Sequence, residues 1–477
     1  MFVAVLSGTA VVVFGPQLTI AGMLLIFAVA LCWVKPALYM QGLLVVGLVL
    51  PAGFTTTQIF SIQISKYNVL YTDVLLGIVV LRWIMGQISG RRHSLTVGVV
   101  SRRLLALIAV LLIYSVFSLI RGLLEYGRFA QSMYDARPVF YYLVILIAFD
   151  YLQTQQDMER LSKSILIGLA LYSSFVLSYF LAPVDHPLSA AQELNAWAYA
   201  NRIGFSNGAY LILGIPMTLW LLMSRRMTMY AKIWIFFALI AFIAVLVLSM
   251  SRTTALTLVL SIILSHIVYS RAYHNRTRMS ILVVRLFLIT SLVLIGILIA
   301  IDHVIPLVLG ESGQYTLETF ARRFDLSSAT AYEAYVAPRI VMLRTAVSLI
   351  LQNPILGYGM GYQFGLLGWS GQVTFVDNSF LTIWIRLGLV GFLSLIVLIG
   401  LLFQSTRRLL RLSHLPDSPY ARILIVSWAG GAIPLLILSL NTSWLVTSSA
   451  VIPLLIIAGA IVGFSTQHER ESIASHS

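Results

Sequence analysis

Charged residues are scarce in this sequence. Only 10% of the 477 residues are Asp, Glu, Lys or Arg, whereas a soluble domain has about 25%. Hydrophobic residues make up 59% of the chain, and its mean hydropathy is +0.94. This composition excludes a soluble enzyme and predicts an all-α polytopic integral membrane protein, with residues 1–477 forming a single membrane domain.

Cysteine and the common catalytic motifs are also missing. The one cysteine, Cys32, lies in an apolar run, which excludes a disulfide framework and a thiolate metal cage. The eight histidines are scattered, and the sequence contains no Walker loop and no HExxH motif. We therefore expect no metal and no cofactor, and we do not expect an ATP-driven pump. The N-terminus has no basic segment before its apolar run, so it is interpreted as a first span rather than a cleaved signal.

Long apolar runs recur along the whole chain and predict 12–14 transmembrane helices, with 14 preferred. The runs are 2–15, 17–34, 40–53, 69–86, 104–120, 138–150, 163–181, 204–222, 232–250, 253–270, 281–303, 379–403, 421–439 and 448–464. Since a perpendicular span needs about 20 residues, the first, third and sixth runs are short.

The net charge of +14 is concentrated in one set of loops and acts as a topology signal. Lys and Arg far outnumber Asp and Glu in loops 87–103, 151–163, 223–232, 271–285 and 404–422. The two signs nearly balance in loops 51–68, 121–137, 182–203, 251–252 and 304–378. By the positive-inside rule the first set is cytoplasmic, as are both termini. Nucleic acid is therefore not needed as a partner to explain the basic charge.

The loop 304–378 is by far the longest, and it is predicted to lie outside the cytoplasmic membrane. Loops of this length without a role are uncommon. Two apolar stripes, at 316–324 and after Pro338, predict amphipathic helices on the membrane surface. The segment 465–477 is predicted to be a polar, frayed cytoplasmic tail.

The most informative stretch covers 338–392. Ile340, Leu343, Val347 and Ile350 recur at helical spacing after Pro338. Asn353 and Pro354 are expected to end this helix. Gly357, Gly359 and Gly361 follow, where the backbone can turn tightly or approach a ligand closely.

Five arginines are predicted to lie on the outer side, where they can bind phosphate through paired hydrogen bonds. They are Arg137, Arg202, Arg252, Arg339 and Arg344. Ser251 and Arg252 stand at the predicted start of a helix, which favours an anion site. The alternative for each arginine is contact with lipid headgroups.

Asp377 and Asn378 precede a long apolar helix. Asp377 is a candidate general base for an attacking hydroxyl group, and its alternative role is an N-cap for that helix. Arg386 lies inside the same helix, so it is expected to face protein or a water-filled cavity, with a structural ion pair as its alternative.

Four segments resemble the O-antigen ligase and O-antigen polymerase superfamily of bacterial membrane glycosyltransferases. They are NRIGFSNGAYLILGIPM, LVLSMSRTTALTLVLSI, PRIVMLRTAVSLILQNPILGYGMG and VDNSFLTIWIRLGLVGF, which together span about 200 to 392. Each motif is weak alone, and the match depends on their order and spacing. The fourteen-span plan and the large outer loop agree with it.

The resemblance implies transfer of sugar chains from a polyprenyl-diphosphate-linked oligosaccharide to a glycan or lipid-glycan acceptor, without a metal. It implies that the arginines hold the diphosphate and that Asp377 activates the acceptor hydroxyl, with Asn378, Ser251, Gly357 and Gly359 in support. Many ligases have His where this chain has Asp377, which favours a polymerase of O-antigen or exopolysaccharide repeats. A Glu is frequent where this chain has Arg386.

Two alternatives remain open. A transporter or flippase of the same lipid would carry charged or broken helices at mid-membrane in repeated halves, whereas the charges here cluster at one predicted face. A peptidoglycan-type polymerase also uses an outward Asp, but the four segments fit it less well.

Overall fold

The computed structural model describes residues 25–49, 61–64, 67–89, 99–181, 206–224, 226–248, 252–273, 337–365, 372–373, 376–411, 416, 418–440, 445 and 451–474. Within these ranges the chain is almost entirely helical, which confirms the all-α prediction. Eight helices are long and apolar enough to cross a membrane, and three shorter apolar helices accompany them. The chain is therefore a multi-pass membrane protein. The prediction of 12–14 spans includes runs that lie outside the described residues.

The first half of the chain supplies a hairpin and seven helical segments. A helix at Leu25–Val34 is followed by α2 (Pro36–Val49), β1 (Ser61–Ile64), β2 (Tyr67–Leu70), α3 (Tyr71–Ile88), α4 (Val99–Tyr126), α5 (Phe129–Phe140), α6 (Leu143–Tyr151) and α7 (Gln155–Leu181). Strands β1 and β2 form an antiparallel hairpin.

The second half supplies the remaining helices and a second, very short hairpin. These elements are η5 (Ser206–Tyr210), α9 (Leu211–Met223), α10 (Met229–Leu248), α11 (Arg252–Tyr273), α15 (Ala337–Gln352), β3 (Phe364–Gly365), β4 (Gln372–Val373), α16 (Ser379–Arg411), α17 (Pro419–Ser439) and α19 (Val451–Ala474). Helix α19 runs to Ala474, so the prediction of a frayed segment from 465 is wrong for most of its length.

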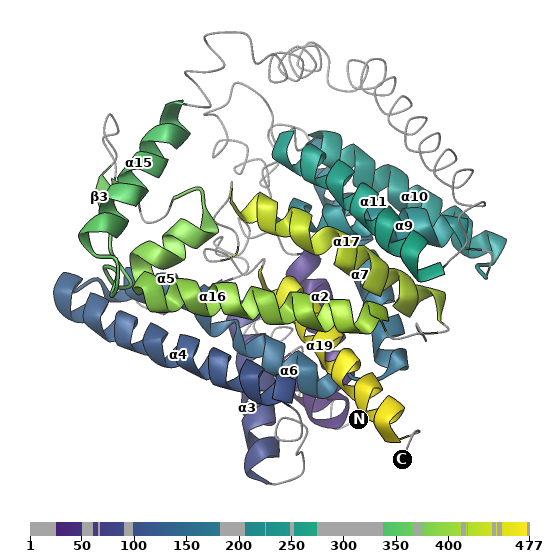
Figure 1. The fold of residues 1–477 in the computed structure, drawn as a ribbon, viewed down its shortest axis with the longest axis horizontal. Helices are drawn as coiled ribbons and strands as arrows, with labels where there is room; N and C mark the ends of the chain where they lie inside the picture. The colour runs from purple at the N-terminus through teal and green to yellow at the C-terminus, as the bar shows by residue number, and fades with distance from the viewer. Residues whose placement is uncertain are drawn as a thin grey trace, which may run out of the picture.

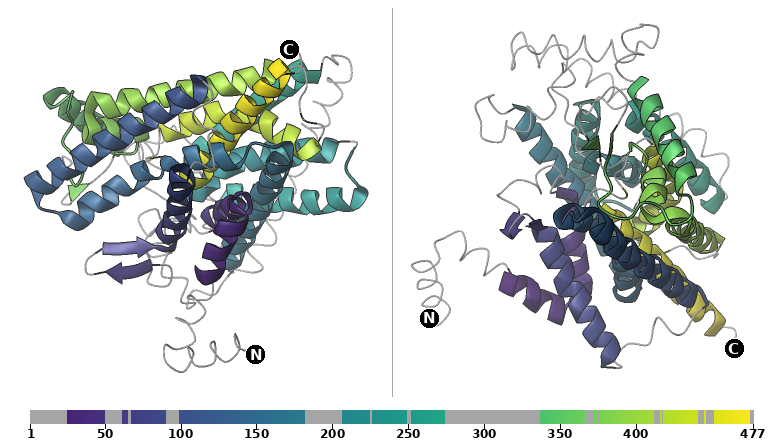
Figure 2. Two further views of the ribbon diagram at one scale, coloured as in Figure 1. Left: turned by 90° about the horizontal axis from the view of Figure 1, so that it is seen from below. Right: turned by 90° about the vertical axis from the view of Figure 1, so that its left-hand side faces the viewer.

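Most of the helices pack in pairs around a large apolar core. Helix α11 packs along α17, α6 along α19, α2 against α7 and α4 along α16. Figure 1 shows α9, α10 and α11 gathered at one side, with α15 standing at the opposite side near one end of α4 and α16. Figure 2 shows α2 and α3 on the side of the bundle away from α16.

The short apolar run predicted at 138–150 belongs to a longer helical segment. Helices α5 and α6 follow one another with only Tyr141 and Tyr142 between them, and together they make a candidate span of 23 residues, Phe129–Tyr151. The predicted start at residue 138 was wrong because the sequence before it is polar. That polar stretch holds Asp135 and Arg137, which are both buried against protein.

Candidate functional site

Helix α16 is broken at Gly388, near the elements that carry the candidate site. Gly388 has φ 63° and ψ −163°, so α16 consists of two limbs, 379–387 and 389–411. A Cβ atom at Gly388 would lie 2.1 Å from the carbonyl oxygen of Ile355. The positive φ and this close approach both require glycine. The apolar sequence around Gly388 predicts a continuous helix, so the break was not expected.

The backbone of the turn at 353–361 forms hydrogen bonds with the backbone on both sides of this break. The amides of Tyr358 and Gly359 donate to the carbonyls of Ile385 and Arg386, at 2.7 and 3.1 Å, and the amide of Leu389 donates back to the turn. Backbone groups left unpaired in a membrane cost several kcal/mol each. Two motifs that are separate in the sequence therefore form one structural unit.

The same turn also docks on α4. The amide of Met360 donates to the Ser118 carbonyl at 3.2 Å, and Arg121 donates through Nη1 to the carbonyl of Gly357 at 2.8 Å. A Cβ at Gly122 would lie 1.8 Å from the carbonyl oxygen of Met360. The side chain of Arg121 therefore helps to hold the turn on α4.

The turn glycines have the backbone conformations predicted for a tight turn. Gly357, Gly359 and Gly361 all have positive φ, between 66° and 90°. A Cβ at Gly357 would lie 2.5 Å from the amide nitrogen of Gly388, and one at Gly359 would lie 3.2 Å from the Ser118 carbonyl oxygen. At these two glycines the close approach is therefore to protein backbone, which gives them a structural role.

Two stacked tyrosines cover the turn. The rings of Tyr358 and Tyr362 are stacked with their centroids 4.2 Å apart. Burial raises the pKa of both phenols above the ordinary value, so both stay neutral at physiological pH. The Tyr358 hydroxyl donates to Oε1 of Gln352 at 2.9 Å, which ties the turn back to the end of α15.

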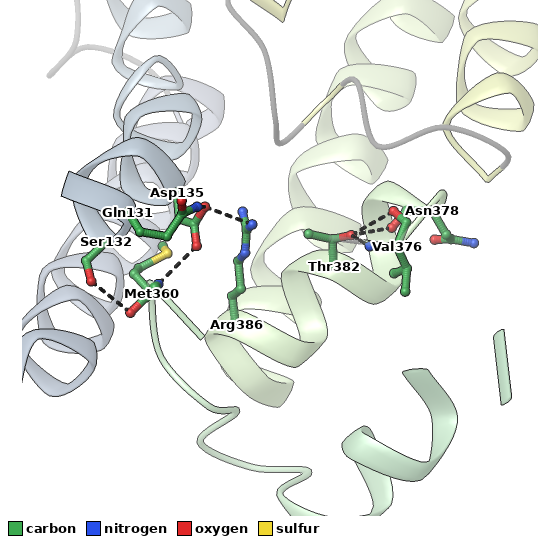
Figure 3. Close-up of polar contacts among 9 residues, drawn as sticks. Gln131, Ser132, Asp135, Met360, Val376, Asn378, Thr382 and Arg386 are labelled. Atoms are coloured by element: carbon green, nitrogen blue, oxygen red, sulfur yellow. Dashed lines mark hydrogen bonds and ion pairs between the residues drawn. The ribbon is translucent and has the colours of Figure 1, made fainter. Parts of the chain in front are cut away.

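A buried ion pair fastens the first limb of α16 to α5. Nη2 of Arg386 lies 2.9 Å from Oδ1 of Asp135, and both side chains are at least 94% buried. Asp135 also accepts hydrogen bonds from the Gly361 amide at 3.0 Å and from Nε2 of Gln131 at 2.8 Å. Figure 3 shows Arg386 reaching across to α5, beside the contact of Ser132 with Met360.

This ion pair settles which of the expected environments Arg386 occupies. The structural ion pair named as its alternative is confirmed, and the partner is Asp135. Asp135 was missed because one carboxylate in a polar stretch gives no signal of its own. The signal that was available was the cost of placing a charge inside a membrane helix, which demands a nearby opposite charge.

Asn378 caps α16. Oδ1 of Asn378 accepts hydrogen bonds from the amides of Phe380 and Leu381, each at 3.0 Å. This is the pattern of an N-cap side chain, which satisfies amides that have no partner within the helix. Asp377 precedes the cap and is exposed. The N-cap role that was considered for Asp377 is therefore filled by its neighbour, Asn378.

The start of α16 is also joined to the segment that follows α17. Nδ2 of Asn378 donates to the Leu440 carbonyl at 3.0 Å, and the Leu445 amide donates to Oγ of Ser379 at 3.3 Å. Ser379 is fully buried. The backbone next to Asp377 is thus fixed by the N-cap contacts of Asn378 and by the hydrogen bonds to the segment after α17.

Helix α15 carries two of the predicted arginines and packs against the first limb of α16. Arg339 and Arg344 are exposed. The residues of α15 that are buried include Ala346 and Leu349, which share an apolar cluster with Val376, the residue directly before Asp377. The structure therefore brings α15 and the start of α16 together as neighbouring elements.

The helix predicted after Pro338 is confirmed, and the apolar stripe predicted to lie on the membrane surface is largely exposed at two of its four positions. Leu343 and Val347 are 51% and 44% exposed, while Ala346 is fully buried. Apolar spacing finds the apolar side of a helix but does not distinguish protein from lipid as the neighbour. The exposed apolar side of α15 fits contact with a membrane.

Arg137 lies in a buried position. Its Nε is 3.3 Å from Oδ2 of Asp73, and the Arg137 side chain is only 8% exposed. The guanidinium also lies over the ring of Tyr134. The carboxylate of Asp73 already balances the charge of Arg137, which favours a structural role. A phosphate contact by Arg137 stays a prediction.

The other predicted site residues are described only in part or not at all. Helix α11 begins at Arg252, as the sequence predicts, but the description there is limited to the backbone. Arg202 and Ser251 lie outside the described residues. No group of three or more His, Cys, Asp or Glu side chains with metal-binding geometry occurs among the residues that the structure describes.

Comparison with known proteins supports the resemblance. Residues 237–396 match the family model Wzy_C, described as O-antigen ligase. The match covers α11, α15, the glycine turn and the first limb of α16, which carry three of the four segments noted from the sequence. No curated protein matches the chain. Over this part of the chain, the match supports the resemblance to the O-antigen ligase and polymerase superfamily.

Proposed function

We propose that this multi-pass membrane protein, with its O-antigen ligase domain at 237–396, polymerises polyprenyl-diphosphate-linked oligosaccharide. An O-antigen or exopolysaccharide polymerase is preferred over a ligase because Asp377 stands where many ligases have His. The acceptor is a glycan or lipid-glycan, and the reaction takes place on the outer face of the bacterial cytoplasmic membrane. Both termini are cytoplasmic in this arrangement.

The observation that carries the proposal is that Asn378 caps α16 while its neighbour Asp377 presents an exposed carboxylate. Asn378 supplies the cap of α16, so the exposed carboxylate of Asp377 is not needed for that purpose. The polar contacts of Asn378 and Ser379 fix the backbone on which Asp377 stands. A fixed, exposed carboxylate is suited to orient an acceptor hydroxyl and to accept its proton.

In the proposed reaction, the acceptor oxygen forms a bond to the anomeric carbon of the donor sugar. The bond between that carbon and the diphosphate oxygen breaks, and the diphosphate leaves with the bonding electrons. The hydroxyl proton moves to Asp377. The products are the extended glycan and the polyprenyl diphosphate, so the step needs no redox partner.

The leaving diphosphate requires positive charge, which arginines supply in this proposal without a metal ion. Arg339 and Arg344 are exposed on α15, the helix that shares an apolar cluster with Val376. A guanidinium group can donate two parallel hydrogen bonds to a phosphate. Arg252 and Arg202 are proposed to complete the diphosphate site.

A transporter of the same lipid is the competing proposal, and the broken helix α16 is the observation that favours it. Transporters use broken helices whose free backbone groups bind substrate or ions. In α16, however, the amides and carbonyls at the break are bonded to the turn at 353–361. This arrangement supports a fixed scaffold and therefore the enzyme.

Reconstitution of the purified protein in liposomes separates these functions. With a lipid-linked oligosaccharide as donor, we expect a ladder of longer lipid-linked glycans and release of polyprenyl diphosphate. A single transfer to a lipid-glycan acceptor would indicate a ligase. Movement of intact donor across the bilayer with no change in glycan length would overturn the proposed enzyme and support the transporter.

A further inference from the structure

A row of aromatic side chains lies where the glycine turn meets the end of α4. The centroids of the stacked Tyr358 and Tyr362 rings are 4.2 Å apart, and the ring of Tyr126, the last residue of α4, lies 5.6 Å from that of Tyr362. Phe364 of β3 also stacks with Tyr362, at 6.2 Å. We call Tyr126, Tyr358 and Tyr362 the aromatic platform.

Hydrogen bonds hold the aromatic platform in place. The Tyr126 hydroxyl donates to the Tyr358 carbonyl at 2.9 Å, and the Tyr358 hydroxyl donates to Gln352, also at 2.9 Å. The turn that carries two of the three tyrosines is itself bonded to α4 and α16. A surface whose side chains are already ordered loses little conformational entropy when a ligand binds. The platform is therefore preorganised for binding.

Polar side chains surround the platform. All three tyrosines are only partly buried, so some of each ring is open to the surroundings. The polar neighbours are Gln352, which bonds to Tyr358, Gln363, which bonds to Arg128, and Glu125, which pairs with Arg121. Their amide, carboxylate and guanidinium groups supply both hydrogen-bond donors and acceptors.

The platform differs from the lipid-facing surface of the same helix. Earlier in α4, Ile113, Ile120 and Leu124 are 70%, 52% and 82% exposed, as expected for residues in contact with lipid tails. The next residues are Glu125 and Tyr126, so the polar and aromatic surface begins where the aliphatic surface ends. Tyrosine is enriched at the boundary between membrane and water, which is where a glycan on a lipid carrier emerges.

Aromatic rings bordered by polar groups match the two kinds of surface that a sugar presents. The faces of a pyranose ring carry C–H groups, which pack against the negative faces of aromatic rings. Its edges carry hydroxyls, which bond to amide, carboxylate and guanidinium groups. An acyl chain makes only the first kind of contact. The composition of the platform therefore favours a glycan over a lipid tail.

The platform and Asp377 lie toward opposite ends of the first limb of α16. The turn that carries Tyr358 bonds to the limb near the break, and the limb, 379–387, is roughly 13 Å long at 1.5 Å per residue. Tyr358 and Tyr362 nevertheless pack against the same apolar cluster as Val376, the residue before Asp377. A single sugar is too short to span this separation, whereas a chain of several sugars can reach both places.

From these contacts, we infer that the aromatic platform binds a sugar of the growing glycan that lies several units away from the sugar reacting at Asp377. This inference rests on the proposed function, which supplies the glycan. Holding the chain at a second place raises its effective concentration at the reacting end between successive additions. Long glycans should therefore bind better than short ones.

Binding of glycan fragments to the full-length protein in phosphatidylcholine nanodiscs tests the inference. The probes are fragments of the surface polysaccharide of the bacterium that makes the protein, cut by mild acid and separated into single repeat units and long fragments. Saturation-transfer difference NMR reports the contact of sugar protons with the protein. We expect long fragments to bind more tightly than single repeat units. Equal affinity for the two would overturn the inference.

Tyr362→Ala makes the test specific. Loss of the central ring should weaken the binding of long fragments about five- to tenfold and leave the binding of single repeat units unchanged. Tyr362→Phe keeps the ring and should retain most of the binding. Tyr362→Leu is a second disrupting variant in case the alanine variant does not fold. Unchanged binding of long fragments in a folded alanine or leucine variant would overturn the inference.

Tyr230→Ala is the matched control. Tyr230 is 70% exposed and contacts the edge of Trp234 on α10, at the opposite side of the molecule from α15 (Figure 1). Its substitution should leave glycan binding unchanged, and equal losses from Tyr230→Ala and Tyr362→Ala would overturn the inference. Tyrosines can also anchor a protein at the membrane surface. A lower Tm for Tyr362→Ala with unchanged glycan binding would indicate that role and overturn the inference.

Kinetic measurements separate this inference from the proposed function. Tyr362→Ala should raise KM for long acceptors at unchanged kcat, whereas Asp377→Asn should lower kcat and bind long fragments like the wild type. Polymer formation by Asp377→Asn with intact binding of long fragments would remove the proposed base and support the platform. Polymer formation by the wild type with equal KM for long and short acceptors would remove the platform alone.

Discussion

A charged residue lies near each end of the first limb of α16, and the two residues have different environments. Arg386, near the break, is buried and paired with Asp135, and the carbonyls around it receive the amides of the turn. Asp377, just before the other end, is exposed, and its neighbour Asn378 carries the capping contacts. Under the proposed function, the buried charge stabilises the scaffold and the exposed charge takes part in the reaction.

The comparison also explains why the two ends should respond to different measurements. Removing one member of a buried pair leaves an uncompensated charge in a medium that solvates it poorly. Removing an exposed charge leaves nothing buried behind, so the fold should be nearly indifferent to it. Stability should therefore report on Arg386, and reaction rate should report on Asp377.

The largest effect on stability is expected from Arg386→Met. Loss of the guanidinium leaves Asp135 buried without its charge partner, and breaking such a pair costs about 3–5 kcal/mol. Thermal unfolding in detergent should show a large drop in Tm. The double variant Asp135→Asn/Arg386→Met should recover part of that loss, and a double variant as unstable as the single one would contradict the pairing.

Substitution of the exposed arginines tests whether exposed charge affects the reaction rate and not the stability. A hydrogen bond to a charged group is worth about 1.5–3 kcal/mol, so Arg339→Ala and Arg344→Ala should each lower kcat/KM by roughly 10- to 150-fold at unchanged Tm. Lysine at either position should restore activity only partly, since it lacks the paired donors.

Arg160→Ala provides the matched control for these arginine variants. Arg160 is an exposed arginine on α7, outside the family match at 237–396. Its substitution should leave the reaction rate unchanged. Equal losses from Arg160→Ala and Arg344→Ala would indicate a nonspecific charge effect and argue against a diphosphate site on α15.

Gly388→Ala probes the break in α16. Alanine at a positive φ costs more than about 1 kcal/mol, and its Cβ would lie 2.1 Å from the carbonyl oxygen of Ile355. The turn and the helix must then separate, so a lower Tm is expected. Gly400→Ala is the control, because a Cβ there meets nothing within 4 Å. Equal Tm values for the two variants would contradict the docked turn.

The smallest effect is expected from Asn378→Ala. Loss of an N-cap side chain costs about 1 kcal/mol, and Tm should fall by a few degrees or less. Asn378→Asp should retain the cap and most of the stability. A loss of activity from Asn378→Ala as large as that from Asp377→Asn would show that the two residues are not divided between structure and chemistry.

The sequence predicted the secondary-structure elements better than it predicted the contacts between them. The helix after Pro338 was predicted because Pro338 and Asn353 mark its ends, and α15 covers Ala337–Gln352. Which of its residues pack on protein could not be predicted, because lipid and protein accept the same side chains: Leu343 and Val347 are exposed, whereas Ala346 is buried. The hydropathy pattern also gave no sign of the helix break at Gly388. The turn that bonds to this break lies elsewhere in the sequence, so the apolar run continues across it.

For the candidate site, the sequence identified residues by type and position, but not by partner. Asp377 and Asn378 were both singled out, yet only coordinates distinguish the residue that caps α16 from the one that is left exposed. Arg386 was expected to need a partner because of its cost in a membrane. Asp135, 251 positions away along the chain, could not be chosen from the other acids by spacing.

The most direct test of the central claim is the reaction rate of purified Asp377→Asn with a lipid-linked oligosaccharide donor. The variant should keep the wild-type Tm and lose 10²- to 10⁴-fold in rate, the usual cost of removing a general base. In cells, it should reach normal abundance while lipid-linked repeats accumulate. A rate within threefold of the wild type would contradict the assignment of this exposed carboxylate to catalysis.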